Sequence, residues 1–397
     1  MAITERWGLR DRCNTAVQCA QEMRAQRSAE RLSYSTTTSF STNSTVPAPT
    51  VTIGLPVYNG ENFLAEAIES VLSQTFEDYE LVICDNASTD RTEEICRRYA
   101  RQDKRVRYHR NVRNWGPAWN YNRTFELSRG RYFKWAAHDD VFAPTLIEKL
   151  VAQLDQYPEA VLAFCEVDII DEVGALKEPY AVEMQLDSDS PAQRFQEMIS
   201  LKHRCYEVFG LVRTEVLAHS ALIGAYAGSD RVLLSWLSLQ GPFKTVAEPL
   251  FSAREHAQQS IAMLRQPRSK LLRMHDYAVW FDPSNKGKVL FPNWRILFEY
   301  IAAIGAAPVG VLGRLSCIWV LLQWLLTYRN VAKLGRDVMI AIAQIVGRAI
   351  TSKVVADEVR AAESQAASTR GTSDFSSDFP SDFSKELIKV NNGSLKS

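Results

Sequence analysis

Two adjacent carboxylates, Asp139 and Asp140, closely follow an apolar run that extends from Tyr132 to Ala136. The run predicts a strand, and Pro144 predicts that a helix starts soon after the pair. Neighbouring carboxylates at such a turn repel one another unless a cation or bound protons offset their charge. Ligands that are all oxygen favour Mg2+ or Mn2+ over zinc. The pair therefore predicts a divalent-metal site, with capping of free backbone amides as the alternative.

Polar residues also follow two earlier apolar runs, at 51–57 and 81–84. Between these runs, apolar residues recur at helical spacing, so the expected order is strand, helix, strand. In open parallel sheets, residues that follow successive strands converge on one crevice at the carboxyl ends of the strands. The residues that this rule brings together are Tyr58, Asn59, Asp85, Asn86, Asp139 and Asp140.

The pattern continues to about residue 260. Apolar runs at 106–108, 132–136, 161–165, 206–212 and 243–251 predict strands, and helical periodicity up to 99 and at 119–128, 144–156, 191–201 and from 230 predicts helices. This alternation indicates an α/β fold with a mostly parallel central sheet flanked by helices. Residues 266–350 are mainly helical in pattern and predict a C-terminal extension.

Five short motifs resemble family 2 glycosyltransferases of the GT-A (nucleotide-diphospho-sugar transferase) fold. They are Pro56-Val-Tyr-Asn59, Asp85-Asn-Ala-Ser-Thr-Asp90, Asn114-Trp-Gly116, Gly130-Arg-Tyr132 and His138-Asp-Asp140, and they keep the family's order and spacing from residue 50 to about 260. The resemblance implies an inverting, metal-dependent transfer of a sugar from a nucleotide-diphosphate donor, with a UDP-sugar as the first expectation. A glycan, polysaccharide or lipid-linked glycan would be the acceptor.

The resemblance also implies roles for individual residues. Asp139 and Asp140 would hold Mn2+ or Mg2+, which offsets the charge on a leaving diphosphate. Because this chain has Asp85-Asn86 where many relatives have Asp-Asp, a thymidine or guanosine donor stays open. The nucleotide pocket would comprise Pro56, Tyr58, Asn59, Asp85, Asn86 and Asp139.

Three later residues complete the implied site. Asp230 stands at a predicted helix start about 90 residues after the acidic pair, where similar enzymes place the general base. A simple helix cap is the alternative for this residue. Arg254 and His256 follow the last predicted strand and match an Arg-x-His element that would bind the diphosphate.

Bulk properties exclude some classes of function. Lys plus Arg equals Asp plus Glu, at 46 each, so no basic field suggests nucleic acid as a partner. The seven cysteines are scattered and contain no Cys-x-x-Cys pair, which favours reduced thiols over a zinc ribbon. The first 50 residues lack the apolar core of a secretory signal. We therefore expect a cytoplasmic protein.

The expected domains are a disordered segment at 1–49, the GT-A domain at 50–262, the helical extension at 263–354 and a disordered tail at 355–397. The apolar run inside 314–336 is shorter than the roughly 20 residues of a membrane-spanning helix. Its tryptophans and its flanking Arg329, Lys333 and Arg336 suit a helix that lies on a membrane, peripherally at the cytoplasmic face. A helix packed on the catalytic domain is the alternative.

Other functions stay possible or are disfavoured. A catalytically inactive nucleotide-sugar-binding scaffold or regulator is the second hypothesis, because relatives carry a Glu-Asp pair where this chain has Ser229-Asp230. A nucleotidyltransferase is disfavoured, since no glycine-rich loop with a basic residue lies near the first strand. Residues 54–60 lack the Gly-x-Gly-x-x-Gly turn of a dehydrogenase.

Overall fold

The computed structural model describes residues 47–180, 183–259, 273–327 and 329–348. The tail expected to be disordered at 355–397 lies outside these residues, as does most of the segment at 1–49. The described residues from Val51 onward belong to one compact unit.

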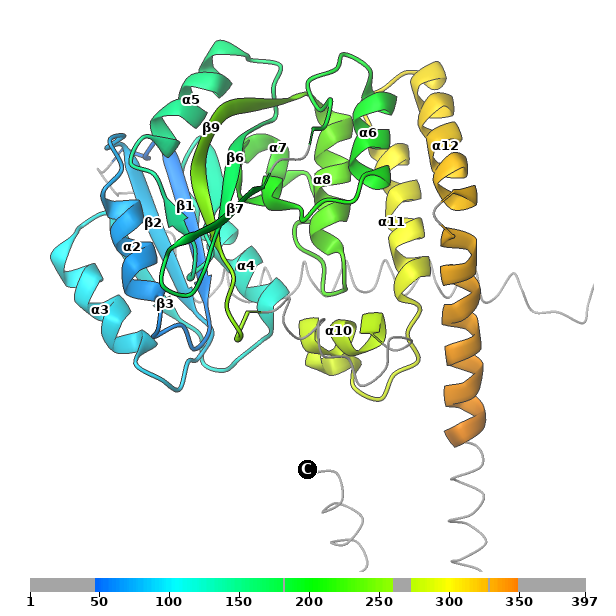
Figure 1. The fold of residues 1–397 in the computed structure, drawn as a ribbon, viewed down its shortest axis with the longest axis horizontal. Helices are drawn as coiled ribbons and strands as arrows, with labels where there is room; N and C mark the ends of the chain where they lie inside the picture. The colour runs from blue at the N-terminus through cyan, green and yellow to red at the C-terminus, as the bar shows by residue number, and fades with distance from the viewer. Residues whose placement is uncertain (1–46, 181–182, 260–272, 328, 349–397) are drawn as a thin grey trace, which may run out of the picture. The chain divides into compact units, whose positions relative to one another are not determined.

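A mixed sheet of nine strands forms the centre of this unit in the described part of the chain, in the order β3-β2-β1-β4-β8-β6-β9-β5, with β7 paired to β6 (Figure 1). The strands β3, β2, β1 and β4 are parallel, as is the pair β6 and β9; the remaining pairs are antiparallel. The bounds are β1 Val51–Val57, β2 Tyr79–Asp85, β3 Val106–Arg110, β4 Tyr132–Trp135, β5 Val141–Phe142, β6 Leu162–Ile170, β7 Leu176–Tyr180, β8 Leu211–Arg213 and β9 Phe243–Arg254.

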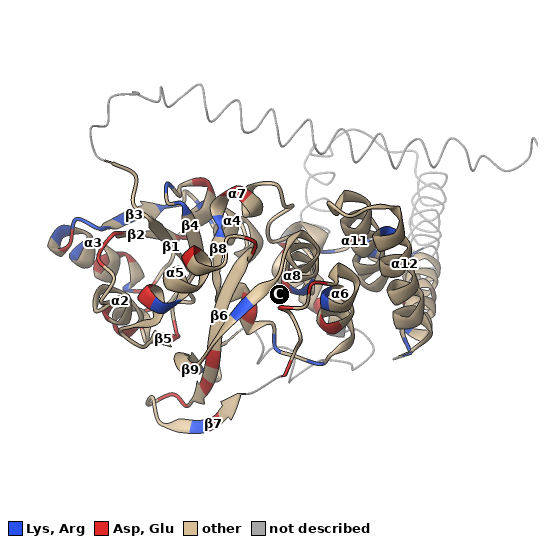
Figure 2. Ribbon diagram, turned by 90° about the horizontal axis from the view of Figure 1, so that it is seen from above, with Lys and Arg blue, Asp and Glu red and all other residues tan. Residues whose placement is uncertain are grey.

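Helices cover this sheet and extend beyond it (Figure 1). Figure 2 shows charged residues along α3, whereas α12 is almost entirely uncharged. The helices are α2 Leu64–Leu72, α3 Thr92–Gln102, α4 Pro117–Glu126, α5 Leu146–Gln156, α6 Pro191–Ser200, α7 Thr214–Ala218, α8 Ser229–Gln240, α10 Arg273–Phe281, α11 Pro292–Ala306 and α12 Val311–Leu326, with short 3-10 turns at Tyr206–Phe209 and Pro283–Asn285. A further helix runs over Asn330–Arg348.

The strand predicted over 206–212 is wrong in its first half. Cys205 adopts a left-handed conformation with φ of 60°, which turns the chain into the 3-10 segment Tyr206–Phe209. Pairing with β4 begins only at Leu211. The short strand β5 was not expected, because two residues give no readable periodicity.

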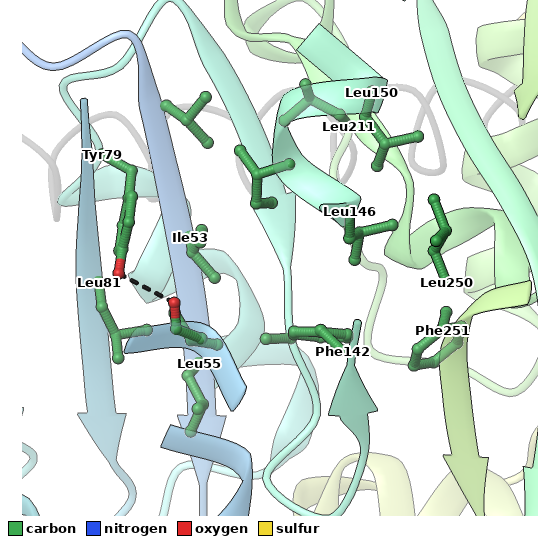
Figure 3. Close-up of a cluster of buried hydrophobic side chains, with 14 of the residues drawn as sticks. Ile53, Leu55, Tyr79, Leu81, Phe142, Leu146, Leu150, Leu211, Leu250 and Phe251 are labelled. Carbon is green, nitrogen blue, oxygen red and sulfur yellow. Dashed lines mark hydrogen bonds between the residues drawn. The ribbon is translucent and has the colours of Figure 1, made fainter. Parts of the chain in front are cut away.

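Alternate residues of the central strands supply two cores on opposite faces of the sheet. On β4, Tyr132 packs in a core with α2, α3 and α5, whereas Phe133 and Trp135 pack in a core with α4 and α8. Figure 3 shows part of the first core, in which the Tyr79 hydroxyl donates to the Val71 carbonyl at 2.9 Å. Each large apolar side chain buried in this way stabilises the fold by about 1.5–3 kcal/mol.

A third core joins the C-terminal helices to the rest of the unit. Phe195 of α6 and Val232 of α8 pack with Tyr300 of α11, Cys317 of α12 and Leu334 of the last helix. The five cysteines in the described part of the chain, Cys84, Cys96, Cys165, Cys205 and Cys317, are buried and free, as expected for reduced thiols.

Lys134 places a charge inside the first core. The residue is 1% exposed, and its ammonium donates to the Phe209 carbonyl and lies 4.4 Å from the centre of the Phe142 ring. Burial lowers the pKa of Lys134 from 10.5 to about 8, against the attraction of Cys165 and Asp140, which raises it. Folding at neutral pH therefore has to place a protonated amine in an apolar site.

This burial predicts a pH-dependent stability. Between pH 8 and 10.5 the unfolded chain keeps a proton on Lys134 that the folded chain has lost, so the residue's contribution to the free energy of unfolding rises with pH over that window. We expect Lys134→Met to be more stable than the wild type at pH 7. Removal of the buried charge should raise the free energy of unfolding by up to about 3 kcal/mol. The lost hydrogen bond to the Phe209 carbonyl should lower it by about 1 kcal/mol.

Urea unfolding at several pH values measures this difference, which should close by pH 10.5. Lys149→Met is the matched control, because Lys149 pairs with Glu248 at the surface. A stability difference between wild type and Lys134→Met that stays constant from pH 7 to pH 10.5 would contradict the explanation.

Candidate active site

The carboxyl ends of β2, β1 and β4 lie side by side, because β1 pairs in parallel with both neighbours. Val57 of β1 lies opposite Asp85 of β2, and the loops that follow β1 and β4 pack closely together. A Cβ atom added to Gly60 would lie 2.6 Å from Cδ2 of His138, so only glycine fits at this contact. The loops that carry the predicted site residues therefore share one edge of the sheet.

Asp85 is buried and fully engaged with the protein. Its carboxylate accepts hydrogen bonds from the Ser88 amide at 2.8 Å, the Tyr108 hydroxyl at 2.8 Å and Nη1 of Arg110 at 2.6 Å. These contacts fix the turn after β2. A nucleotide that touched Asp85, as the sequence predicts, would have to share the carboxylate with them.

Asn86 holds the loop that precedes α4. Its Nδ2 donates to Oδ1 of Asn114 at 2.8 Å and to the Gly116 carbonyl at 3.1 Å, and its Oδ1 accepts from Nδ2 of Asn111 and the amide of Trp115. A carboxylate cannot donate to these two acceptors. The amide of Asn86 therefore has a structural role that Asp could not fill at this position.

The other predicted nucleotide residues occupy the end of β1. Pro56 is buried within the strand, and Tyr58 is 45% exposed. Asn59 has a φ of 50° and ties the two loops together, because its Oδ1 accepts from the Thr89 amide at 2.8 Å while its own amide donates to Oγ of Ser88. Tyr58 thus presents an aromatic ring at the rim of rigid loops.

The end of β9 holds the acidic pair. Asp139 accepts from Nε2 of His256 at 2.8 Å, and Asp140 accepts from the Arg254 amide at 2.9 Å. Directly after the pair, Val141 of β5 lies opposite Ser252 of β9. Strand β9 and the residues just after it therefore contact both the acidic pair and the strand β5 that follows the pair.

The pKa values of the two carboxyl groups are shifted in opposite directions. Burial raises the pKa of Asp139, but the neighbouring His138 and the hydrogen bond from His256 outweigh burial and hold that pKa below its ordinary value. Burial and then the charge of Asp139 raise the pKa of Asp140 well above its ordinary value. The pair thus carries an electrostatic strain that either a proton or a cation relieves.

Arg254 clamps the acidic turn. Nε donates to the Asp139 carbonyl at 2.9 Å, Nη1 donates to the carbonyls of Asp171 and Glu172 at 3.2 Å each, and Nη2 lies 2.7 Å from a carboxylate oxygen of Glu66. The side chain is 1% exposed. The diphosphate contact that the sequence predicts for Arg254 would require the guanidinium to leave these partners.

His256 is similarly enclosed, with 5% of its side chain exposed and its ring centre 4.7 Å from that of Phe63. Its Nε2 faces Asp139, so in this arrangement the imidazole supports a carboxylate. Contact with a diphosphate stays a prediction.

Asp230 is the second residue of α8, which begins after Gly228 at a φ of 82°. Its Oδ1 accepts from the Arg231 amide at 2.8 Å, and the residue is partly exposed. Burial, and after it the charges of Asp139, Asp140 and Asp230 together with Tyr277, raise the pKa of Tyr121 on α4. All three carboxylates are therefore within electrostatic reach of one buried phenol.

Nothing in the sequence singles out Tyr121. It lies in a predicted helix among other aromatic residues, and nothing in its spacing separates it from a packing residue. Asp85, by contrast, is two strands away from the acidic pair, roughly 10 Å at the usual spacing of strands.

The acidic pair fits part of a metal site. Among the described residues, no group of three or more His, Cys, Asp or Glu side chains is arranged to hold a metal ion. Asp139 and Asp140 offer oxygen donors with an unbalanced charge, which suits Mg2+ or Mn2+ when substrate phosphates and water complete the shell.

The clamp predicts a large effect for a conservative substitution. Arg254→Lys keeps the charge but loses the planar fork, so the carbonyls of Asp139, Asp171 and Glu172 lose donors. We expect the free energy of unfolding, measured with urea, to fall by about 2–4 kcal/mol. Arg97→Lys is the control, because its pair with Glu93 is exposed and should cost less than about 0.5 kcal/mol. Equal losses in the two variants would show that the guanidinium does not hold the turn.

Comparisons with known proteins agree on one family. The family model described as Glycosyl transferase family 2 matches residues 52–217. An uncharacterized glycosyltransferase of Rickettsia typhi is 35% identical over 126 residues, which cover 32% of this chain and 38% of that protein. The putative glycosyltransferase EpsE of Bacillus subtilis is 35% identical over 127 residues, 32% of this chain and 46% of that one. The chain thus spans less than half the length of these two relatives.

Among solved structures, Staphylococcus aureus TarS residues 1–349 in complex with UDP-GlcNAc aligns with a TM-score of 0.51 at 14% identity, over 70% of this chain and 73% of that one. This likeness concerns the fold alone. The family match contains Asp85 and the acidic pair, whereas Asp230, Arg254 and His256 lie beyond it. The expected GT-A fold is confirmed, and residues 52–217 match the model of glycosyltransferase family 2, as the sequence motifs predicted.

Proposed function

We propose that this chain is an inverting, metal-dependent glycosyltransferase that moves a sugar from a nucleotide diphosphate to a glycan, polysaccharide or lipid-linked acceptor. The observation that carries the proposal is the acidic pair: two neighbouring carboxylates, one with a raised pKa, held by one strand at the carboxyl edge of the sheet. A buried charge of this kind is typical of a site that receives a cation.

The loops that follow β1 and β2 are proposed to bind the nucleotide of the donor. The half-exposed ring of Tyr58 supports stacking against a base, and UDP is the first candidate because the TarS neighbour holds UDP-GlcNAc. A Mn2+ or Mg2+ ion held by Asp139 and Asp140 would supply charge neutralisation at the leaving diphosphate. His256 keeps Asp139 ionised, and Arg254 keeps the turn in place for the donor.

Asp230 is proposed as the general base. An inverting reaction requires a base to take the proton of the acceptor hydroxyl while its oxygen attacks the anomeric carbon from the face opposite the diphosphate. The start of α8 stabilises the carboxylate through the partial positive charge of the helix end. The shared influence of Asp139, Asp140 and Asp230 on Tyr121 supports a common site.

Substitution of the acidic pair tests the metal. In a panel of UDP-glucose, UDP-GlcNAc and GDP-mannose, we expect the wild type to hydrolyse one donor in the presence of Mn2+, and Asp140→Asn to do so at least about 100-fold more slowly. Addition of Mn2+ with the donor should raise the Tm of the wild type but not of Asp140→Asn. Asp187→Asn, an exposed carboxylate in a loop, is the control. Equal hydrolysis in Asp140→Asn or in EDTA removes the metal assignment.

A second substitution separates catalysis from binding. Asn has nearly the size of Asp, and its side-chain oxygen can still accept from the Arg231 amide, so Asp230→Asn should leave the Tm nearly unchanged. We expect its kcat for transfer to fall by about 100- to 10,000-fold while the Kd for the donor stays within about two-fold. A wild-type chain that binds a nucleotide sugar without any turnover would favour the alternative of an inactive scaffold or regulator. The cytoplasmic location stays a prediction.

A further inference from the structure

α12 has apolar residues on both of its faces. The inner face contributes Cys317, Val320 and Leu321 to the third core. The outer face carries large apolar side chains that are 45–83% exposed and recur every three or four residues: Val311, Leu312, Leu315, Ile318, Trp319, Leu322 and Leu326. A helix at a solvated surface normally carries polar residues on its outer face.

The next helix, Asn330–Arg348, repeats this arrangement. Its inner side buries Leu334, Ile340 and Ala341. Its outer side exposes Val331, Val338, Met339, Ile342, Ile345 and Val346 by 37–66%. We name the exposed apolar residues of the two helices the outward surface. This many exposed apolar side chains on two consecutive helices, which meet at an angle of 67°, are typical of a site that contacts another protein or a membrane.

The charges on the two helices have one sign. Residues 311–348 contain the cations Arg314, Arg329, Lys333, Arg336 and Arg348 and a single acid, Asp337. Asp337 is fully buried and accepts hydrogen bonds from the amide and Nδ2 of Asn293 at 2.7 and 2.8 Å. The two helices therefore expose cations without a carboxylate, which complements an anionic surface.

The helices are unsuited to crossing a bilayer one at a time. Among the described residues, no single helix is long and apolar enough to cross a membrane, although the bent pair Val311–Leu326 and Asn330–Arg348 meets the length and composition together. α12 is about 24 Å long, against a hydrocarbon core of roughly 30 Å. Its inner face is also occupied by protein contacts, so one side alone is available to lipid.

A second copy of the chain fits the outward surface less well. In a two-fold dimer the same surface meets itself, so the cations of one copy would face those of the other. Anionic headgroups remove this repulsion, and Trp319, 62% exposed, suits the boundary between headgroups and acyl chains. The charge and the hydrophobicity of the two helices thus both favour an anionic lipid surface over a second copy of the chain.

We propose that the outward surface lies in the headgroup region of an anionic lipid bilayer, with both helices in the plane of the membrane. The proposal extends the sequence-based expectation for 314–336 to a two-helix surface and to a lipid charge. It does not depend on the transferase chemistry, so the inactive Asp140→Asn chain should bind membranes as the wild type does.

Vesicle flotation of the full chain tests the proposal. We expect the chain to float with vesicles of phosphatidylcholine and phosphatidylglycerol at low salt and to bind pure phosphatidylcholine at least about ten-fold more weakly. Leu315→Glu and Trp319→Glu should each weaken binding by about ten-fold or more. Leu176→Glu, at a site 62% exposed on β7, is the matched control and should bind as the wild type does.

The cations are tested in the same assay. Arg314→Glu should weaken binding by more than the roughly five-fold expected for the loss of one cation near an anionic surface. Arg131→Glu is the control, since this side chain is 63% exposed directly before β4 and pairs with Asp155 of α5. Melting curves confirm that each variant is folded.

Release by high salt or alkaline carbonate supports the proposal. Retention through alkaline carbonate would mean that the bent helix pair spans the bilayer, and it would overturn the in-plane arrangement. Self-association without vesicle binding, abolished by Leu315→Glu, would assign the outward surface to a second copy. A full chain that stays unbound in every vesicle would also overturn the proposal.

Discussion

The clamp between the end of β9 and the acidic turn is the interaction on which the candidate site depends. Asp139 and Asp140 are adjacent, Asp140 is buried and the side chain of Asp139 is only 13% exposed, so solvent does little to screen their repulsion. His256 and the backbone and guanidinium of Arg254 act on both residues, and β5 returns to β9 immediately after them. The end of β9 and the two residues that follow it make these contacts. They therefore fix the separation of the two carboxylates before any ligand binds.

The loops beside the acidic turn follow the same rule. Asp85 and Asn86 direct their polar atoms into the protein, where each atom has a partner, and Asn59 connects the two loops. A rim that is already hydrogen-bonded loses little conformational entropy when a ligand binds. The exposed ring of Tyr58 then stands on a rigid support. Residues that look like ligands in the sequence can therefore serve a site by holding its shape.

The sequence predicted the parallel half of the fold, because long helices and buried strands repeat their apolar pattern often enough to be read. It also predicted which strand ends carry polar residues. It could not predict their partners: Tyr108, Arg110 and Asn114 reach Asp85 and Asn86 from other segments of the chain. For the same reason Arg254 was expected to face a ligand, whereas its guanidinium is buried against carbonyls contributed by distant segments. Likewise, the pKa of Tyr121 is raised in part by Asp139, Asp140 and Asp230, which are distant from it in sequence.

The two readings of α12 in the sequence, a helix at a membrane and a helix packed on the domain, are compatible because they concern opposite faces. The inner face accounts for the buried Cys317 and Leu321, yet packing on one side gives no reason for Leu312 and Trp319 to be apolar and exposed. Leaving such side chains in water costs about 25 cal/mol for each Å² of apolar surface. The inner face packs this helix against α6 and α8, and the first turn of α8 carries Asp230. A membrane at the outer face would therefore be connected through packed helices to the proposed base.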